Sequence, residues 1–398
     1  MPRMSLLGHI RHLSEDIGPR GSATEGEAQA ADYVQERLSG WGLQPERQPV
    51  LSATSAYAPF IVVTGAALLG VLLFWQPQPV GAAAAFLLAA TALGAVLLEL
   101  TSNDNPLRWV IPTGWSQNVL ATIPAAEPGE QRPPILITAH LDTHRAPLLF
   151  SSPAWRRAFR IMMPAGLGCL AALVVIFAVG IFSPARALRE LALAPGALVA
   201  VILLLMIQAA TSPLTKGAND NASGVAVALA LAERLAHRPL RHRTVIVAFT
   251  GCEEVGAYGA EALIRARRQD LRGAVHLVID HVGGLRGRNL GPTVVRSEKF
   301  LRRVGCDPHL VQMAQRVADA QPELSVQVRD FDRAYSELSV GAKYGLRPLG
   351  LIGLTPEGDL PNWHTLSDVI DHLDEGTLER ATEFAWRLLQ AIDAEDGA

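Results

Sequence analysis

The sequence predicts an α/β protein: a mostly parallel mixed sheet with helices on both faces, interrupted by two apolar helical hairpins. Three observations lead to this fold class. Helical and strand patterns alternate along the parts of the chain that carry charge. The strand patterns are short apolar runs that end in polar or glycine residues, as buried parallel strands do. Residues 48–98, 161–185 and 191–215 contain no charged residue, which is typical of membrane-spanning helices.

The first element is a helix in "TEGEAQAADYVQERLSGWG" (24–42). Thr24 and Glu27 have the spacing of a capping box, in which each side chain pairs with the other residue's main-chain N–H. Apolar residues then recur at helical spacing, and Gly40 marks the end.

Strands and helices alternate through the remaining charged segments. Strands are expected in "QNVLATIP" (117–124), "PILITAHLD" (134–142), "TVIVAFTG" (244–251), "AVHLVIDHVG" (274–283) and "LRPLGLIGL" (346–354). Two further helices are expected in "DNASGVAVALALAERLA" (220–236) and "EGTLERATEFAWRLLQAID" (375–393). This order favours one α/β domain that resumes after each apolar hairpin.

The apolar segments predict four membrane spans in two hairpins. The spans lie at about 59–75, 81–100, 161–182 and 193–212, each close to the roughly 20 residues that cross a bilayer core. The turns "QPQPV" (76–80) and "SPARALREL" (183–191) separate the paired helices. The predicted divisions are 1–57, 103–158 and 214–398 for the α/β domain, and 58–102 and 159–213 for the hairpins.

Each hairpin returns the chain to the side that it left, so charge near the spans predicts the orientation. Basic residues on the α/β side are Arg47, Arg108, Arg156, Arg157, Arg160 and Lys216. The first hairpin tip has none, and the second has Arg186 and Arg189. The N-terminus lacks a signal-peptide pattern. We therefore expect a multi-pass protein of the cell membrane, with the α/β domain and both termini in the cytoplasm.

Composition excludes several classes of function. The net charge of −3 gives no electrostatic reason to expect nucleic acid as a partner. The three scattered cysteines fit neither a disulfide framework nor a CxxC metal site. Only 18% of residues are charged and 49% are hydrophobic, which favours a chain with membrane segments and the lipid bilayer as a partner.

Acidic and histidine residues gather at the predicted strand ends, where ligands of α/β folds bind. Two divalent metals roughly 3.5–4 Å apart need a bridging carboxylate together with further carboxylates and imidazoles. Five residues supply such a set: His140, Asp220, Glu254, Asp280 and His364.

Two neighbouring carboxylates suit supporting roles. Asp142, two residues after His140, is placed to accept the other N–H of that imidazole. Glu253 can stay off the metals and act as general base toward metal-bound water. Further side chains of ligand type are less favoured: His144, His281 and Asp368.

Five motifs, in order, resemble a known family. "HLD", "GANDNASG", "FTGCEEVGAYGAEAL", "VIDHVG" and "WHTLSD" are similar to those of the two-metal zinc peptidases that include bacterial leucine aminopeptidases, glutamate carboxypeptidase II and glutaminyl cyclases. The resemblance covers the chain outside the hairpins, including the helix at 24–42, and implies a phosphorylase/hydrolase-like zinc peptidase domain.

The resemblance implies two zinc ions per chain, one held by His140 and Asp280, the other by Glu254 and His364, with Asp220 between them. Cobalt and manganese also suit these ligands. The "NDN" corner would then present the bridging carboxylate at the start of a helix.

The implied reaction is hydrolysis of a peptide bond near a free N-terminus. One zinc polarises the carbonyl, a bridging water attacks, and Glu253 carries its proton to the leaving amine. Asp142 orients the histidine. Tyr335, in "FDRAYSEL" (331–338), is a candidate donor to the oxyanion, and Trp363 is a candidate wall of the specificity pocket.

The chain departs from the family pattern in its two insertions. The connection from Thr143 to Asn219 is usually short and here holds the second hairpin, while the first hairpin precedes the strand at 117–124. We expect the insertions to hold the metal centre near the bilayer. The expected substrate is a short peptide that arises at the membrane, or the tail of a membrane protein.

Three alternatives compete with a membrane aminopeptidase. The same metal set serves carboxypeptidases and glutaminyl cyclases, which the motifs do not separate. A catalytically inactive membrane scaffold is disfavoured because no ligand is missing. An ion transporter is disfavoured because the four predicted spans carry no charged residue apart from Glu99, next to the end of the second span.

Overall fold

The structure is a computed structural model that describes residues 4–76, 78–101, 105–127, 132–299, 302–332 and 334–395. The chain divides into two compact units. The sheet unit comprises Met1–Thr54, Gly114–His144 and Leu214–Ala398. The helical unit comprises Ser55–Thr113 and Arg145–Pro213, and so includes residues 55–57, 105–113 and 145–158, which were predicted to belong to the α/β domain.

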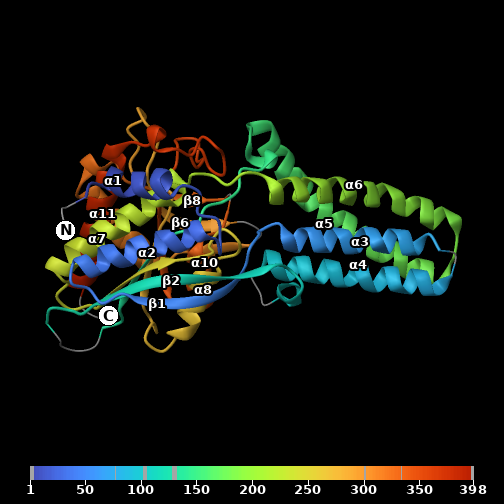
Figure 1. Ribbon diagram of the computed structural model, residues 1–398, viewed down its shortest axis with the longest axis horizontal. Helices are drawn as coiled ribbons and strands as arrows, with labels where there is room; N and C mark the ends of the chain where they lie inside the picture. Colours follow the sequence, from blue (N-terminus) through green and yellow to red (C-terminus); the bar gives the residue numbers. More distant parts are fainter. Residues whose placement is uncertain are drawn as a thin grey trace. The chain divides into compact units, whose positions relative to one another are not determined.

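The described strands form a nine-stranded mixed sheet (Figure 1). They are β1 Glu46–Ala53, β2 Thr113–Ile123, β3 Ile135–His140, β4 Val245–Thr250, β5 Val275–Ile279, β6 Thr293–Lys299, β7 Arg303–Gly305, β8 Gln327–Phe331 and β9 Arg347–Ile352. The order is β1-β2-β4-β3-β5-β9-β6-β7, with β8 beside β6. The central strands β4, β3, β5 and β9 are parallel, whereas β2 and β6 run antiparallel to their neighbours β4 and β9.

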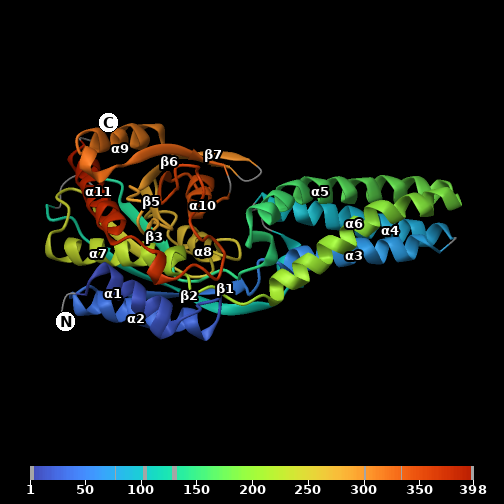
Figure 2. The same cartoon turned by 90° about the horizontal axis from the view of Figure 1, so that it is seen from above.

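Helices cover both faces of this sheet (Figure 2). One face packs against α1 Leu6–Arg11, α2 Glu25–Gly40, α7 Gly224–His237, α9 Pro308–Asp319 and α11 Glu375–Ala394. The other face packs against α8 Tyr258–Ala266 and α10 Glu337–Lys343. Because side chains alternate along a strand, Ile135 and Ile137 of β3 enter the first core and Leu136 enters the second. The predicted mixed α/β fold is confirmed.

Short helical turns complete the sheet unit: η1 His12–Ile17, η4 Ala218–Ser223, η5 Pro322–Leu324 and η6 Ile370–His372. The turn η4 lies directly before α7 and carries the predicted bridging aspartate.

The predicted capping box at α2 is wrong. Thr24 is the N-cap residue, but its hydroxyl donates to the carbonyl of Gly21 at 2.6 Å. Glu27 is fully buried and accepts hydrogen bonds from the main-chain N–H of Cys252 at 2.7 Å and from the hydroxyl of Ser116 at 2.7 Å. The carboxylate also accepts from the main-chain N–H of Ala23 at 2.9 Å, one residue before the N-cap, and so joins the start of α2 to the loop after β4.

The helical unit contains α3 Ala58–Phe74, α4 Pro79–Leu100, α5 Pro153–Phe182 and α6 Arg186–Thr211, which run beside one another (Figures 1 and 2), with the short turns η2 Pro106–Trp109 and η3 Leu148–Phe150. Three of these helices, α4, α5 and α6, are long and apolar enough to cross a membrane. The fourth, α3, is apolar but has 17 residues. Of the four predicted spans, three thus correspond to helices of spanning length. The predicted turn at 76–80 includes Pro77, which lies outside the described residues.

Over the uncharged stretches 58–98, 161–182 and 191–211, the four helices are apolar on their inner and outer surfaces. Alanines at helical spacing form the buried stripe of α4: Ala82, Ala85, Ala89, Ala92 and Ala95. Large apolar side chains are exposed on the outer surfaces, among them Leu72, Leu87, Val175 and Leu204. Helices that are apolar all round belong in a large core or in a membrane.

Candidate metal centre

The predicted ligands lie at one edge of the sheet. His140 is the last residue of β3, and Asp280 directly follows β5. Glu254 lies in the loop after β4. Since β4, β3 and β5 are adjacent and parallel, their carboxyl ends meet at the same edge. The strand ends therefore bring together ligands that are far apart in the sequence.

One group of donor atoms consists of His140, Asp220 and Asp280. Nε2 of His140 lies 3.3 Å from Oδ1 of Asp220 and 3.4 Å from Oδ1 of Asp280. His140 and Asp220 are buried, and Asp280 is partly exposed. Burial lowers the pKa of His140, but the carboxylate of Asp280 and its neighbours outweigh this and raise that pKa well above its ordinary value.

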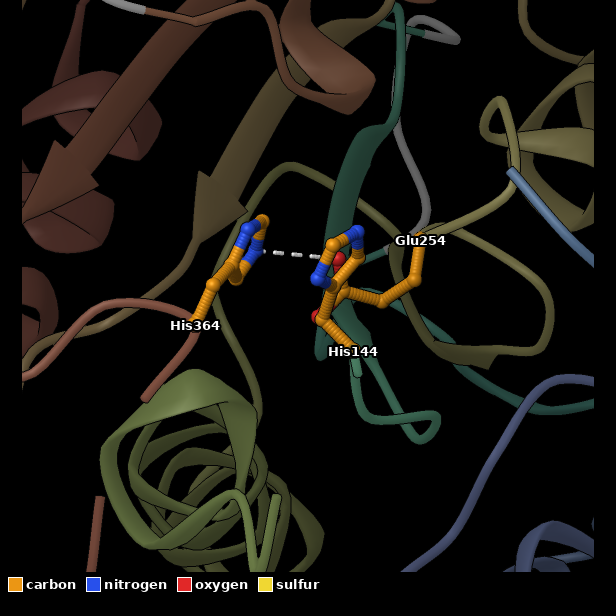
Figure 3. Close-up of side chains that lie close together, drawn as sticks. All are labelled: His144, Glu254 and His364. Atoms are coloured by element: carbon orange, nitrogen blue, oxygen red, sulfur yellow. Dashed lines mark ion pairs between the residues drawn. The ribbon is translucent and has the colours of Figure 1, made fainter. Parts of the chain in front are cut away.

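A second group consists of His144, Glu254 and His364 (Figure 3). Nε2 of His364 lies 3.2 Å from Oε2 of Glu254 and 3.4 Å from Oδ2 of Asp220. Asp220 thus directs one oxygen toward the histidine of each group. This is the arrangement that a bridging carboxylate requires.

The donor sets fit zinc. Imidazole nitrogens and carboxylate oxygens are zinc ligands, and in both groups the donor atoms lie within 4.8 Å of one another. Oε1 of Glu254 and Oδ1 of Asp280 are buried without a hydrogen-bond partner. Burial, and then the carboxylate of Asp220, raises the pKa of Glu254 well above its ordinary value. A bound cation would relieve both the unpaired oxygens and the crowding of carboxylates.

Asp142 contacts both His140 and the Glu253–Glu254 pair. Its main-chain carbonyl is 3.1 Å from Nδ1 of His140, and its carboxylate Oδ1 is 3.4 Å from that nitrogen. The same carboxylate accepts hydrogen bonds from the main-chain N–H groups of Glu253 at 2.9 Å and Glu254 at 3.1 Å. A third donor is the hydroxyl of Ser22 at 2.6 Å. Asp142 therefore holds the glutamate loop as well as the histidine.

The two asparagines beside Asp220 fix the corner that carries it. The side chain of Asn219 accepts from the N–H of Gly283 at 2.7 Å, and that of Asn221 donates to the carbonyl of Ile279 at 3.0 Å. Both partners flank Asp280, so the polar corner is tied directly to the strand end that bears another ligand.

The three less favoured ligand candidates, Asp368, His281 and His144, have different partners in the structure. Asp368 accepts from the main-chain N–H groups of Asn219 at 2.7 Å and Asp220 at 3.1 Å, and burial raises its pKa to about 6. Nε2 of His281 lies 2.8 Å from the carbonyl of Pro361. His144 alone of the three belongs to a metal-ligand group within the described residues.

Two further predicted residues lie near the groups. The rings of Trp363 and His364 are 4.2 Å apart. The hydroxyl of Tyr335 is 3.9 Å from where a Cβ on Gly256 would lie, in the loop that follows Glu253 and Glu254. Burial, partly opposed by His140, raises the pKa of Glu253 well above its ordinary value.

The structural role of Arg20 was not predicted from the sequence. This arginine is buried and donates to main-chain carbonyls of Leu13, Gly18, Leu141, Lys216 and Gly217, at distances from 2.7 to 3.0 Å. The last three carbonyls flank the His140 and Asp220 segments. A charged residue within "GPRGS", between two glycines in an otherwise small-residue turn, was the available signal.

Three ligand-bearing loops hold a non-glycine residue in the left-handed backbone region. These are Cys252 (φ 56°), His281 (φ 53°) and His364 (φ 54°). Such conformations cost about 1–3 kcal/mol each and cluster at functional sites, where the surrounding structure enforces them.

Residues 205–389 match the model of Peptidase family M28. They contain Asp220, Glu254, Asp280 and His364, together with Glu253. A comparison with curated proteins gives no match.

Similar folds occur among solved structures. A glutaminyl cyclase from Bacteroides thetaiotaomicron, bound to N-acetylhistamine, has a TM-score of 0.56 at 15% identity, over 98% of this chain and 97% of that one. A leucine aminopeptidase precursor from the same species has a TM-score of 0.56 at 14% identity, over 98% and 97%. BSAP, a zinc aminopeptidase from Bacillus subtilis, has a TM-score of 0.56 at 14% identity, over 96% and 93%.

At these identities the solved structures support the fold, and the match to Peptidase family M28 supports the chemistry that the donor groups suggest. The chain is therefore a zinc-dependent metallopeptidase, a hydrolase that resembles Peptidase family M28 over its carboxyl-terminal half.

Proposed function

We propose that this metallopeptidase is a membrane-embedded aminopeptidase that uses two zinc ions to remove N-terminal residues from peptides. The observation that carries the proposal is the position of Asp220, whose Oδ1 and Oδ2 lie 3.3 and 3.4 Å from Nε2 of His140 and of His364. One carboxylate shared between two histidine-containing groups is the requirement for a pair of adjacent metals.

In this proposal His140 and Asp280 would hold one ion, Glu254 and His364 would hold the other, and Asp220 would be shared by both. When bound, the ions supply Lewis acidity and stabilise the negative charge that develops on the peptide oxygen.

Glu253 is the proposed general base. It adjoins the ligand Glu254, and the hydrogen bond from its own main-chain N–H to Asp142 fixes the backbone beneath it. Its carboxylate accepts a proton from the attacking water and delivers that proton to the leaving amine nitrogen. The Tyr335 hydroxyl donates a hydrogen bond to the oxyanion, and the Trp363 ring lines the pocket for the N-terminal side chain.

The helical unit is proposed to span the membrane with all four helices, including the shorter α3, and to leave the sheet unit on the cytoplasmic side. Its support is the large apolar side chains exposed on α4, α5 and α6 and the basic residues near the start of α5, Arg156, Arg157 and Arg160. The proposed substrates are short peptides released at the membrane or the tails of membrane proteins.

The test of the activity uses the full chain, purified in detergent and loaded with zinc. Unblocked peptides, their N-acetylated copies and peptides that begin with glutamine are compared by release of free amino acids and by mass. Cleavage of unblocked peptides alone, one residue at a time, supports the aminopeptidase. Cleavage from the other end of acetylated peptides indicates a carboxypeptidase, and loss of ammonia from N-terminal glutamine indicates a cyclase. Absence of both zinc and turnover would favour the scaffold.

The test of the membrane arrangement is a reporter fused after Ala398, read on intact cells. A signal from the cytoplasm supports the orientation, whereas an external signal contradicts it. In a second experiment, short linkers replace both apolar segments. If the shortened chain cleaves soluble peptides but no longer cleaves a peptide carried by a membrane anchor, the helical unit serves substrate access rather than catalysis.

A further inference from the structure

His144 is the last residue of the sheet unit before the chain enters the second apolar insertion. Its carbonyl accepts a hydrogen bond at 2.9 Å from the N–H of Thr215, close to where the chain re-enters the sheet unit. The side chain is 8% exposed. The backbone of His144 is thus fixed by a hydrogen bond to the returning chain segment, and its side chain is buried.

This imidazole lies at the second donor group. One of its ring nitrogens is within 4.8 Å of the donor atoms of Glu254 and His364. The rings of His144 and His364 stack, with centroids 3.6 Å apart and an interplanar angle of 14° (Figure 3). Glu254 and His364 follow strands that come later in the chain, whereas His144 lies directly before the second apolar insertion.

The two groups would be chemically alike without His144. Each would contain one imidazole, one carboxylate of its own and one oxygen of Asp220. Zinc in proteins is usually four-coordinate, and a site with three protein ligands keeps a position open, whereas four protein ligands close it. A second imidazole in one group alone would therefore make the two sites unequal.

We infer that His144 is a protein ligand of the second metal, the ion held by Glu254 and His364. This inference rests on the proposed two-metal site. It assigns four protein ligands to the second ion and three to the first, so the second ion is the more tightly held. It also places a metal ligand directly before the second apolar insertion, in addition to the five ligands that the sequence motifs identify.

The test measures zinc retained by the full chain in detergent against increasing chelator. The wild-type protein should lose its two ions in separate steps. His144→Phe keeps a flat ring for stacking on His364 but has no donor atom. It should retain the first ion and release the second at a chelator concentration lower by more than about 100-fold, a larger loss than an outer partner usually causes. His144→Ala should behave in the same way, and the exposed His237→Phe should match the wild type.

Each other result overturns the inference. Wild-type retention by His144→Phe combined with loss in His144→Ala would mean that the ring only packs against His364. Wild-type retention by both variants would mean that His144 has no part in metal binding. A wild-type chain that binds zinc at neither site would remove the proposed function as well, so the two failures are distinguishable.

Discussion

The carboxylate of Asp142 accepts a hydrogen bond at 2.9 Å from the main-chain N–H of Glu253. An aspartate two residues after one metal ligand thereby sets the backbone of the proposed base and of the ligand that follows it. The coupling between the HxD motif and the glutamate pair is direct.

Asp142→Asn should therefore impair activity and metal binding together. The carboxylate now accepts hydrogen bonds from Glu253, Glu254 and Ser22. In the variant, the N–H₂ group of the amide, itself a donor, faces one of these three donors, and that hydrogen bond is lost. We expect losses of about 10–100-fold in both zinc affinity and kcat/KM. Ser22→Ala is the matched control, because it removes one donor and leaves the two main-chain bonds. An equal loss in the two variants would contradict the role assigned to the glutamate loop.

Substitutions of the adjacent residues Glu253 and Glu254 should have different effects on kcat and on zinc content. Glu253→Gln should lower kcat by about 10²–10⁴-fold while zinc content stays at the wild-type level, because a general base moves a proton and holds no metal. Glu254→Gln should lose zinc, because Oε2 of Glu254 lies in the second donor group, 3.2 Å from His364. Kinetics and metal analysis on the same preparations check both. Loss of zinc in Glu253→Gln would make Glu253 a ligand.

Tyr335→Phe tests the proposed hydrogen bond to the oxyanion. The substitution removes only the hydroxyl, which lies near Gly256 in the glutamate loop. We expect kcat to fall by about 10–100-fold with little change in KM, because the bond forms mainly in the transition state. Tyr344→Phe, whose hydroxyl donates to Glu261 at 2.9 Å, is the control and should retain activity. A rise in KM alone would assign Tyr335 to substrate binding.

Arg20→Met should destabilise the sheet unit. It leaves several buried carbonyls without their donor, and each such group costs about 1–3 kcal/mol. The thermal unfolding midpoint should fall by about 5 °C or more. Arg11→Met is the control, since Arg11 is exposed and its ion pair with Glu15 at 3.5 Å contributes little. An unchanged midpoint for Arg20→Met would show that water replaces the guanidinium.

Glu298 should make stability depend on pH. Burial raises the pKa of its carboxyl to about 7, although Ser336 and Ser339 donate to it. The folded chain therefore holds this proton more tightly than the unfolded chain, whose glutamate has its ordinary value of 4.5. The stabilising contribution is complete below about 4.5 and is lost as the pH rises through about 7.

The variant Glu298→Gln has no such proton. Relative to the wild type, its stability should improve by about 3 kcal/mol between pH 4.5 and pH 7. Unfolding midpoints across this range measure the difference. The exposed Glu323→Gln should follow the wild type at each pH, and a parallel course for Glu298→Gln would contradict the shifted pKa.

The sequence predicted the core of the sheet and the grouping of ligands because both depend on local pattern. β3, β4 and β5 are fully buried, so their residues are almost all apolar, and each run stops where a polar side chain appears. Parallel neighbours then bring those stops to one edge. His140 and Asp280 could be placed on this basis alone.

Other features depend on contacts between distant segments. Glu27 has the spacing of a capping residue, but its carboxylate accepts from Ala23 instead of the N-cap Thr24, and from buried donors 89 and 225 positions away. The strands β6 and β8 mix exposed and buried residues and so lack a clear apolar run. His144 follows no strand directly, and only the folded chain brings its ring beside His364.

The hydrogen bond between His144 and Thr215 closes the second insertion at its base, so the intervening residues 145–214 form a loop whose ends are already joined. The entropy lost on closing a loop grows only with the logarithm of its length, and a doubling adds about 0.6 kcal/mol. The sheet can therefore accept an insertion of almost any length at this point. A lineage of such enzymes could gain, lose or exchange these apolar helices here without redesigning the catalytic fold.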